Sequence, residues 1–385
     1  MYRLRLVKSR LVETSRALSE IVSLASWDEF RLAPTRRKTR WRRFSELVYI
    51  SLRWGEVSNR YYMQGLDRVE SRVGRDYMPY STFRAIRNAR NRRPGMGTPY
   101  DYVCVFQDKL LFERYFAAGG LPVVASEFVV RPARLIEPGG DAISVDDLIA
   151  SGKPQRLFCK PQCGIRGANT FMLDIGANGL FIDGAPAEPS MLEDRLGDER
   201  YLFQRPITQH EQIAKLHPTS VNTLRVVTYR RADDTEVLSV SLRMGADGDI
   251  TDNAGANRVF AGIRDEEGRL IETGYRATGE RFFETRTHPT TGVRFRDCAI
   301  PFYRECLDLA RRAHAWIPEV YSVGWDIAVT PEGPRLLEGN DDWSGRVMLM
   351  VPGFRDRVLR AHDLLDTGSP ARLAPGEASA AARHH

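Results

Sequence analysis

The sequence predicts an α+β protein, and three observations support that class. Residues 110–120, LLFERYFAAGG, form an amphipathic helical run that stops at two glycines. From residue 205 onward, strand-like apolar runs predominate before a second helical run at 301–317. Residues 323–340, VGWDIAVTPEGPRLLEGN, contain two apolar runs joined by the turn residues 331–334, which is typical of a hairpin.

Length and composition are those of a globular protein with more than one domain. The chain has 385 residues, of which 42% are hydrophobic and 28% charged. No apolar run approaches the roughly 20 residues that a membrane-spanning helix needs, and the first residues lack the apolar core of a signal peptide. The five cysteines are an odd number in a long chain, which favours a reducing compartment. We therefore expect a cytoplasmic protein.

Changes in composition divide the chain into four predicted parts. Residues 1–100 are rich in arginine and aromatic residues with helical spacing, and NARNRRPGMGTP (88–99) is the strongest boundary. Residues 101–204 and 205–365 are expected to form two further lobes. Residues 366–385 have the composition of a disordered tail, and the terminal His384 and His385 resemble a tag remnant.

Positive charge is concentrated in residues 35–43, TRRKTRWRR, although the formal net charge of the chain is only +6. Such a segment could contact nucleic-acid phosphates, an anionic membrane surface or a phosphorylated carrier. It could equally be a solvated helix face. No recognised nucleic-acid fold accompanies it, so sequence-specific nucleic-acid binding is not expected.

The predicted hairpin carries a candidate metal site. Asp326 lies in its first apolar run, and Glu338 and Asn340 end the second. Glu338 and Asn340 are two residues apart, so on one strand their side chains share a face. Carboxylate and amide oxygens are ligands that Mg²⁺ accepts, usually together with water and substrate phosphates. An isolated hairpin of this kind can also be a solvated loop.

Two lysines precede features that can bind phosphate. Lys160 ends a strand-like run and is followed by a loop that contains Gly164 and Gly167. Backbone N–H groups of such a loop can face phosphate oxygens while the lysine adds a point charge. Lys109 opens the helical run described above. Downstream, Gln204 ends another strand-like run, and Glu211 follows seven residues later.

In this order, the residues resemble the ATP-grasp superfamily, and most closely its sugar-transfer-associated branch. The resemblance covers residues 101–345 and implies two α+β lobes that clasp ATP, preceded by a basic, mostly helical region. It implies the following roles: Lys109 and Lys160 at the phosphates, Gln204, Arg205 and Pro206 at the adenine, Glu211 at the ribose, and Asp326, Glu338 and Asn340 as Mg²⁺ ligands.

One departure from the better-known ligases of this superfamily concerns the cation that stabilises the transition state. Gly324 stands where D-alanine ligases place an arginine. Arg225 and Arg243 are the candidates to replace it, because both lie in apolar runs where a charge needs an anionic partner. Each could instead pair with a neighbouring carboxylate.

Asn257 belongs to the run DNAGANRVFAG, which in the resembling family borders the phosphates and the acceptor. The run could also be an ordinary surface turn. Ser220 has no partner base that the sequence reveals, so nucleophilic catalysis is not predicted.

The resemblance implies an ATP-dependent carboxylate–amine ligase that forms an amide through an acylphosphate. Its partners would be a small-molecule carboxylate and an amine, with an amino acid, a peptide or a sugar-linked molecule among them. Two alternatives stay open: a phosphotransferase that acts on a small molecule, and a nucleotide-binding module without catalysis.

Overall fold

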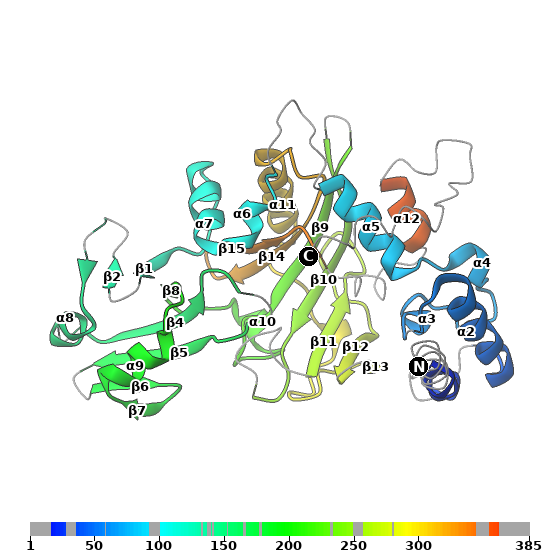
Figure 1. The fold of residues 1–385 in the computed structure, drawn as a ribbon, viewed down its shortest axis with the longest axis horizontal. Coiled ribbons are helices and arrows are strands. Elements are labelled where there is room, and N and C mark those ends of the chain that lie inside the picture. The colour runs from blue at the N-terminus through cyan, green and yellow to red at the C-terminus, as the bar shows by residue number, and fades with distance from the viewer. Residues whose placement is uncertain are drawn as a thin grey trace, which may run out of the picture.

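The computed structural model describes most of the chain outside its two ends. The described residues are 17–27, 36–57, 59–91, 101–131, 134–136, 140, 142–151, 153–164, 167–176, 179–231, 234–248, 257–278, 281–343 and 354–361. Residues 92–99 of the predicted boundary run 88–99, and the predicted tail at 366–385, lie outside them. The strands of the described part form two antiparallel sheets, and helices pack around the second (Figure 1).

The first sheet has eight strands in the order β3-β2-β1-β8-β4-β5-β6-β7. Its strands are β1 (Ser126–Arg131), β2 (Arg134–Ile136), β3 (Ala142–Ile143), β4 (Gln155–Pro161), β5 (Phe171–Gly176), β6 (Gly179–Ile182), β7 (Ala185–Ala187) and β8 (Tyr201–Gln204). Two short helices, α8 (Val145–Ala150) and α9 (Pro189–Leu196), pack on it through Leu148 and Leu192. A capping box between Ser144 and Asp147 begins α8.

The second sheet has seven strands in the order β13-β12-β11-β10-β9-β14-β15. Its strands are β9 (Thr223–Arg231), β10 (Asp234–Met244), β11 (Asn257–Gly262), β12 (Gly274–Thr278), β13 (Arg281–Thr285), β14 (Ser322–Thr330) and β15 (Gly333–Asn340). Strands β14 and β15 pair in antiparallel register, which confirms the predicted hairpin.

Alternation along these strands gives the second sheet two different faces. Leu224 and Val226 of β9 and Leu242 of β10 pack into one core with helix α11 (Tyr303–Trp316). Helices α6 (Cys104–Gln107) and α7 (Lys109–Ala118) join the same core through Phe106 and Phe116. The opposite face carries polar residues, and it is the face that lines the pocket described below.

Helix α7 begins and ends where the sequence indicates. The Asp108 side chain accepts hydrogen bonds from the backbone N–H groups of Leu110 (2.9 Å) and Leu111 (3.0 Å) and so caps the helix. Gly119 follows its last turn, and Gly120 has a left-handed backbone with φ of 68°. This cap fixes Lys109 as the first residue of the helix.

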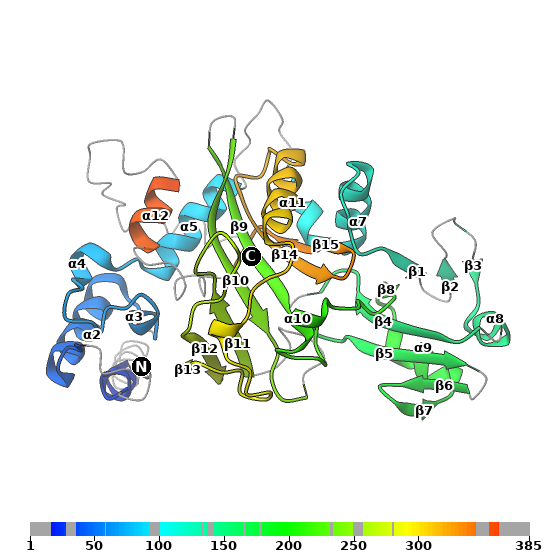
Figure 2. The same ribbon diagram turned by 180° about the vertical axis from the view of Figure 1, so that it is seen from behind.

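The N-terminal region is helical, as predicted, and packs against the second sheet. Residues 17–25 are helical, followed by α2 (Arg40–Trp54), α3 (Arg60–Met63), α4 (Val73–Asp76) and α5 (Tyr80–Asn91). Their buried side chains share a core with strands β9–β13 and with α12 (Phe354–Ala361). Figures 1 and 2 show these helices on the side of the second sheet opposite the first sheet. The last short elements are α10 (Glu211–Ala214) and the 3₁₀ turn Phe295–Asp297.

Several basic residues of the segment 35–43 make contacts within the protein. Lys38 is buried and pairs with Glu46 at 2.8 Å, while Arg37 and Arg43 donate to the carbonyl oxygen of Trp27. Trp41 is 81% exposed, and Arg42 is exposed beside it. The cationic surface available to a partner is therefore smaller than the sequence suggests. No helix in the described ranges is both long enough and apolar enough to cross a membrane.

Two buried histidines predict a loss of stability in acid. The His314 ring bridges the Thr228 hydroxyl (2.7 Å) and the Val320 carbonyl oxygen (2.8 Å), and His288 donates to the Gly245 carbonyl oxygen (2.8 Å). Burial lowers the pKa of each to about 4 from the usual 6.5. Between these values the unfolded chain binds protons that the folded protein excludes, so stability is complete above pH 6.5 and falls toward pH 4.

We expect this loss to reach about 3 kcal/mol for each histidine at pH 4. Urea unfolding measured between pH 7 and pH 4 would show it. The His314→Gln variant should be less stable at pH 7 but should depend less on pH. A parent protein equally stable at pH 7 and pH 5 would contradict the prediction.

Candidate active site

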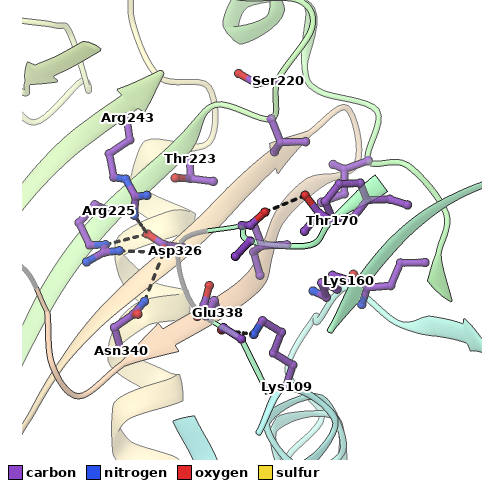
Figure 3. Close-up of a pocket in the computed structure, with 18 of the residues that line it drawn as sticks. Lys109, Lys160, Thr170, Ser220, Thr223, Arg225, Arg243, Asp326, Glu338 and Asn340 are labelled. Carbon is purple, nitrogen blue, oxygen red and sulfur yellow. Dashed lines mark hydrogen bonds and ion pairs between the residues drawn. The ribbon is translucent and has the colours of Figure 1, made fainter. Parts of the chain in front are cut away.

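A pocket of about 1080 Å³ lies between the two sheets. The first sheet contributes residues of β4, β5 and β8, and the second contributes residues of β9, β10, β11, β14 and β15. Ten of the lining residues are labelled in Figure 3. Most of the residues that the sequence singled out meet here.

A row of four side chains crosses the second sheet along the pocket. Glu338 of β15 is paired with Asp326 of β14, Asp326 with Arg225 of β9, and Arg225 with Ser241 of β10. Directly paired residues of antiparallel strands share a face, so the register itself brings these groups together. Arg243, two residues after Ser241, lies on the same face.

Both predicted arginines bind Asp326. Arg225 donates from Nε to Oδ1 (2.7 Å) and from Nη2 to Oδ2 (2.8 Å), and Arg243 donates from Nη1 to Oδ1 (2.8 Å). The three residues are only 5–7% exposed. Burial alone would raise the pKa of Asp326, but the two guanidinium groups outweigh it and hold the pKa below the usual value. Asp326 is therefore ionised and held rigidly.

The space at Gly324 is too small for the arginine that D-alanine ligases place there. A Cβ at this position would lie 2.6 Å from Cβ of Trp343 and 3.1 Å from Nη1 of Arg225. Residue 324 has no room for a side chain, because Trp343 and the Arg225 guanidinium fill that volume. The cation in this part of the site comes from β9 instead.

Glu338 and Asn340 complete the group from β15. The Asn340 side chain donates to Asp326 Oδ2 at 3.3 Å. Burial and the facing Asp326 carboxylate raise the pKa of Glu338, while Lys109, Lys160 and Arg225 oppose that rise. Gly339, between the two, faces the other side, where a Cβ would lie 2.6 Å from the Phe106 ring. Close packing on that side fixes the strand that carries both ligand candidates.

The two predicted lysines enter the pocket from different elements. Lys160 lies on β4 of the first sheet and is 8% exposed, and Lys109 begins α7, which packs against the second sheet. Burial lowers the pKa of Lys160 to about 8, with Glu338 acting against this and Lys109 adding to it. Lys109 Nζ donates to the carbonyl oxygen of Gly164 at 2.6 Å. The lysine and the glycine loop are thus in contact.

The predicted adenine-binding segment also lines the pocket. Gln204 is 3% exposed and donates from Nε2 to the Val124 carbonyl oxygen at 3.0 Å, which anchors the end of β8. Arg205 is exposed and pairs with Glu127 at 2.9 Å. Both residues line the pocket together with Pro206.

Two predicted site residues are not brought together with the others. Glu211 begins α10, is exposed and does not line the pocket. Its proposed contact with a ribose therefore has no support from this geometry. Asn257 begins β11 opposite Thr278, but its side chain lies outside the described part of the protein. Its neighbour Arg258 does line the pocket.

The comparison with protein families settles the classification. The model of the family described as "Sugar-transfer associated ATP-grasp" matches residues 97–360, which is more than half of the chain. The chain belongs to this family. The protein therefore has the ATP-grasp fold, with two α+β lobes preceded by a helical N-terminal region.

Solved structures similar to this ATP-grasp protein are only distant relatives. One is N5-carboxyaminoimidazole synthase from Aspergillus clavatus, with 13% identity, a TM-score of 0.38, and coverage of 70% of this chain and 54% of that one. Another is an L-amino acid ligase from Bacillus licheniformis, with 10% identity, a TM-score of 0.35, and coverage of 66% and 45%. A third is D-alanine–D-alanine ligase from Bacillus anthracis, with 14% identity, a TM-score of 0.34, and coverage of 70% and 69%. The chain thus spans about half of the length of the first two. No curated protein matches it.

The ATP-grasp pocket contains residues that sequence reasoning missed. Tyr80, Arg84 and Asn88 of α5 line it, although they belong to the N-terminal region. Their spacing of four residues in YSTFRAIRNARN is the signal that could have revealed a shared helix face.

Ser220 corrects one expectation, because it does have a partner base. Nδ1 of His217 lies 2.7 Å from Ser220 Oγ, and both residues are 1% exposed. A Cβ at Gly245 would lie 2.6 Å from Ser220 Oγ and 3.0 Å from the His217 ring, so the pair is tightly packed at the edge of the pocket, which Ser220 lines. This packing indicates that the pair holds the turn before β9.

The oxygen-rich end of β14 and β15 fits a hard divalent cation. It offers two carboxylates and an amide oxygen, and the like charges of Asp326 and Glu338 would be relieved by a cation between them. Within the described ranges no cluster of three or more His, Cys, Asp or Glu side chains could hold a metal. The site therefore suits Mg²⁺ that is completed by substrate phosphates better than a metal held by the protein alone.

Proposed function

We propose that the protein is an ATP-dependent carboxylate–amine ligase that forms an amide through an acylphosphate. The observation that carries the proposal is the row Glu338, Asp326, Arg225, which faces Lys109 and Lys160 across one pocket. Glu338 and Asp326 supply negative charge for a divalent cation, and the two lysines supply positive charge for the phosphates. Family membership and the ligase names of the distant structures are consistent with it.

ATP would lie with its adenine beside Gln204–Pro206 and its phosphates between Lys109 and Lys160. Asp326, Glu338 and Asn340 would hold Mg²⁺ against the phosphates. The metal would supply charge neutralisation on the transferring phosphoryl group. Phe158 and Met172, which line the same part of the pocket, would provide apolar surface for the base.

The reaction has two steps. A substrate carboxylate oxygen attacks the γ-phosphorus, ADP leaves, and an acylphosphate forms. An amine then attacks the acyl carbon, phosphate leaves, and the nitrogen loses a proton as the amide forms. The role of the protein in both steps is to position the reactants and stabilise charge, and no protein nucleophile is required. Arg225 and Arg243, which both bind Asp326, would lie beside the phosphates and are the candidate cations for the transferring group.

Product analysis tests this proposal directly. The protein is incubated with ATP, Mg²⁺ and a panel of carboxylic acids with amines, and mass spectrometry identifies ATP-dependent condensation products. An amide with stoichiometric ADP and phosphate supports the ligase. ADP together with a phosphorylated alcohol would replace it with a phosphotransferase, and nucleotide binding without ADP formation on any acceptor would indicate a binding module.

The Lys160→Ala substitution should weaken the binding of ATP more than the binding of adenosine. Loss of a charge-assisted bond in a buried setting predicts a difference of about 1.5 to 3 kcal/mol in binding free energy. Titration calorimetry with both ligands measures it, and Lys153→Ala is the matched control, because Lys153 is exposed on the same lobe and outside the pocket. Parent-like ATP affinity of Lys160→Ala would remove the lysine from the phosphate site.

A further inference from the structure

Helix α5 joins the N-terminal region to the active site through a buried row of side chains. This row is spaced four residues apart and consists of Phe83, Arg87 and Asn91. Asn91 donates from Nδ2 to the carbonyl oxygens of Ser322 and Asp341, both at 2.9 Å. Arg87 donates to the Trp343 carbonyl oxygen and pairs with Asp342. The helix is therefore fastened to the segment that directly follows Asn340.

A second row on α5 faces the pocket. Its members, Tyr80, Arg84 and Asn88, are again four residues apart. The Oδ1 atom of Asn88 accepts from Arg87 Nε at 3.2 Å, which fixes the amide. Because the buried row anchors the helix, this row stands at a set distance from the predicted metal ligands.

The pocket-facing row carries one cation, Arg84. Arg84 Nη2 lies 3.7 Å from Asp342 Oδ2, and both side chains are about half exposed, at 49% and 55%. An exposed pair at this distance contributes little and can be exchanged for a ligand. The Arg60 guanidinium lies 3.7 Å from the centre of the Tyr80 ring and brings a second positive charge to this wall.

Strand β11 also contributes a cation and an aromatic ring to this part of the pocket. Arg258 and Phe260 of β11 line the pocket, and Phe260 is paired with Arg243 of β10. This end of the pocket lies away from the first lobe. Figures 1 and 2 show α5 and β11 farther from the first sheet than β14 and β15 are. A nucleotide held between Lys109 and Lys160 would leave it open.

Several of the cations that line the pocket are already paired with carboxylates. Eight cationic residues line the pocket and only four acidic ones: Arg84, Lys109, Arg156, Lys160, Arg205, Arg225, Arg243 and Arg258 against Asp326, Glu338, Asp341 and Asp342. Arg225 and Arg243 are paired with Asp326, Arg156 with Asp174, and Arg205 with Glu127. Asp342 already pairs with the buried Arg87, so the half-exposed Arg84 of α5 can favour an additional anion.

We propose that the row Tyr80, Arg84, Asn88 binds the carboxylic-acid substrate, and that this substrate carries a second anionic group besides its reacting carboxylate. The proposal rests on the proposed function, because it places the reacting carboxylate beside the metal ligands and the second anion at Arg84. A guanidinium offers forked donors that match either a carboxylate or a phosphate. Asn88 would add a neutral hydrogen bond, and the Tyr80 ring would cover the body of the substrate.

Pairs of ligands that differ only in the second anion test this proposal. Calorimetry is performed with Mg²⁺ and an ATP analogue that cannot transfer its γ-phosphate. The pairs are L-glutamate with L-glutamine, and glucuronic acid 1-phosphate with glucuronic acid. We expect the parent to bind the doubly charged member of at least one pair about tenfold more tightly. The pair that shows the preference distinguishes a carboxylate from a phosphate.

Arg84→Gln should abolish that preference without changing the affinity for the ATP analogue. Arg53→Gln is the matched control, because Arg53 is exposed on α2 and does not line the pocket. It should keep the preference. Equal binding of both members of each pair to the parent, or a preference that survives Arg84→Gln, would overturn the proposal.

Failure of the proposed function would look different. If Arg84 sets the preference but the product of ATP turnover is a phosphorylated alcohol, the role of α5 stands and the ligase assignment fails. If amides form from singly charged acids only, the ligase assignment stands and the role of α5 fails.

Discussion

Glu338→Gln is expected to reduce ATP turnover by about 100- to 1000-fold while leaving the protein folded. Glutamine has nearly the same shape but cannot supply the second negative charge to a divalent cation. Stability should be preserved, because Glu338 faces the Asp326 carboxylate and its burial already raises its pKa. The variant is assayed for ADP release at saturating Mg²⁺ and for melting temperature.

Glu332→Gln is the matched control for this experiment. Glu332 lies in the exposed turn of the same β14–β15 hairpin and does not line the active-site pocket. It should turn over ATP like the parent. Normal turnover by Glu338→Gln would refute the metal-site assignment.

Removal of Asp326 should behave differently from removal of Glu338. Asp326→Ala leaves Arg225 and Arg243 buried without their carboxylate, and breaking a buried ion pair from one side costs about 3 to 5 kcal/mol. Loss of activity in that variant would not separate a metal ligand from a structural acid. Glu338 is therefore the more informative position.

The hairpin shows why much of the site was predictable from the sequence. Once two apolar runs are joined by a short turn, antiparallel register and alternation decide which side chains share a face. That logic placed Asp326, Glu338 and Asn340 together, and the pairing Asp326 with Glu338 is what the structure has. The Lys160 loop and the capped start of α7 are likewise local signals.

Contacts between distant segments were not predictable in the same way. Asn91 binds Ser322 and Asp341, more than 200 residues away, through bonds that no local pattern encodes. The sequence could not identify the partner of Arg225 for the same reason. A buried arginine must have an anionic partner, but the sequence does not show which carboxylate it is. Trp343 fills the space at Gly324 only because the segment after β15 folds back over β14.

The two arginines on Asp326 provide the last and most discriminating prediction. Arg225 holds both carboxylate oxygens, whereas Arg243 holds one. Lysine keeps the charge but cannot make the forked pair. Arg225→Lys should therefore lower the melting temperature by several degrees, reflecting about 1 to 3 kcal/mol, and weaken Mg²⁺-dependent ATP binding together with turnover. Arg243→Lys can retain a bond to Asp326 Oδ1, so its losses of melting temperature and ATP affinity should be smaller than those of Arg225→Lys.

Comparison of this pair separates transition-state stabilisation from support of Asp326. If Arg243 faces the transferring phosphoryl group, Arg243→Lys should lose about 100-fold in kcat with little change in KM for ATP, which is the signature of an interaction made in the transition state. If Arg225 has that role instead, its lysine variant will lose kcat even where excess Mg²⁺ restores ATP binding. Parallel losses of stability, affinity and turnover in both variants would make the two arginines a scaffold for Asp326, and the transition-state cation would then have to be another cation of the pocket, with Lys109 and Lys160 the first to test.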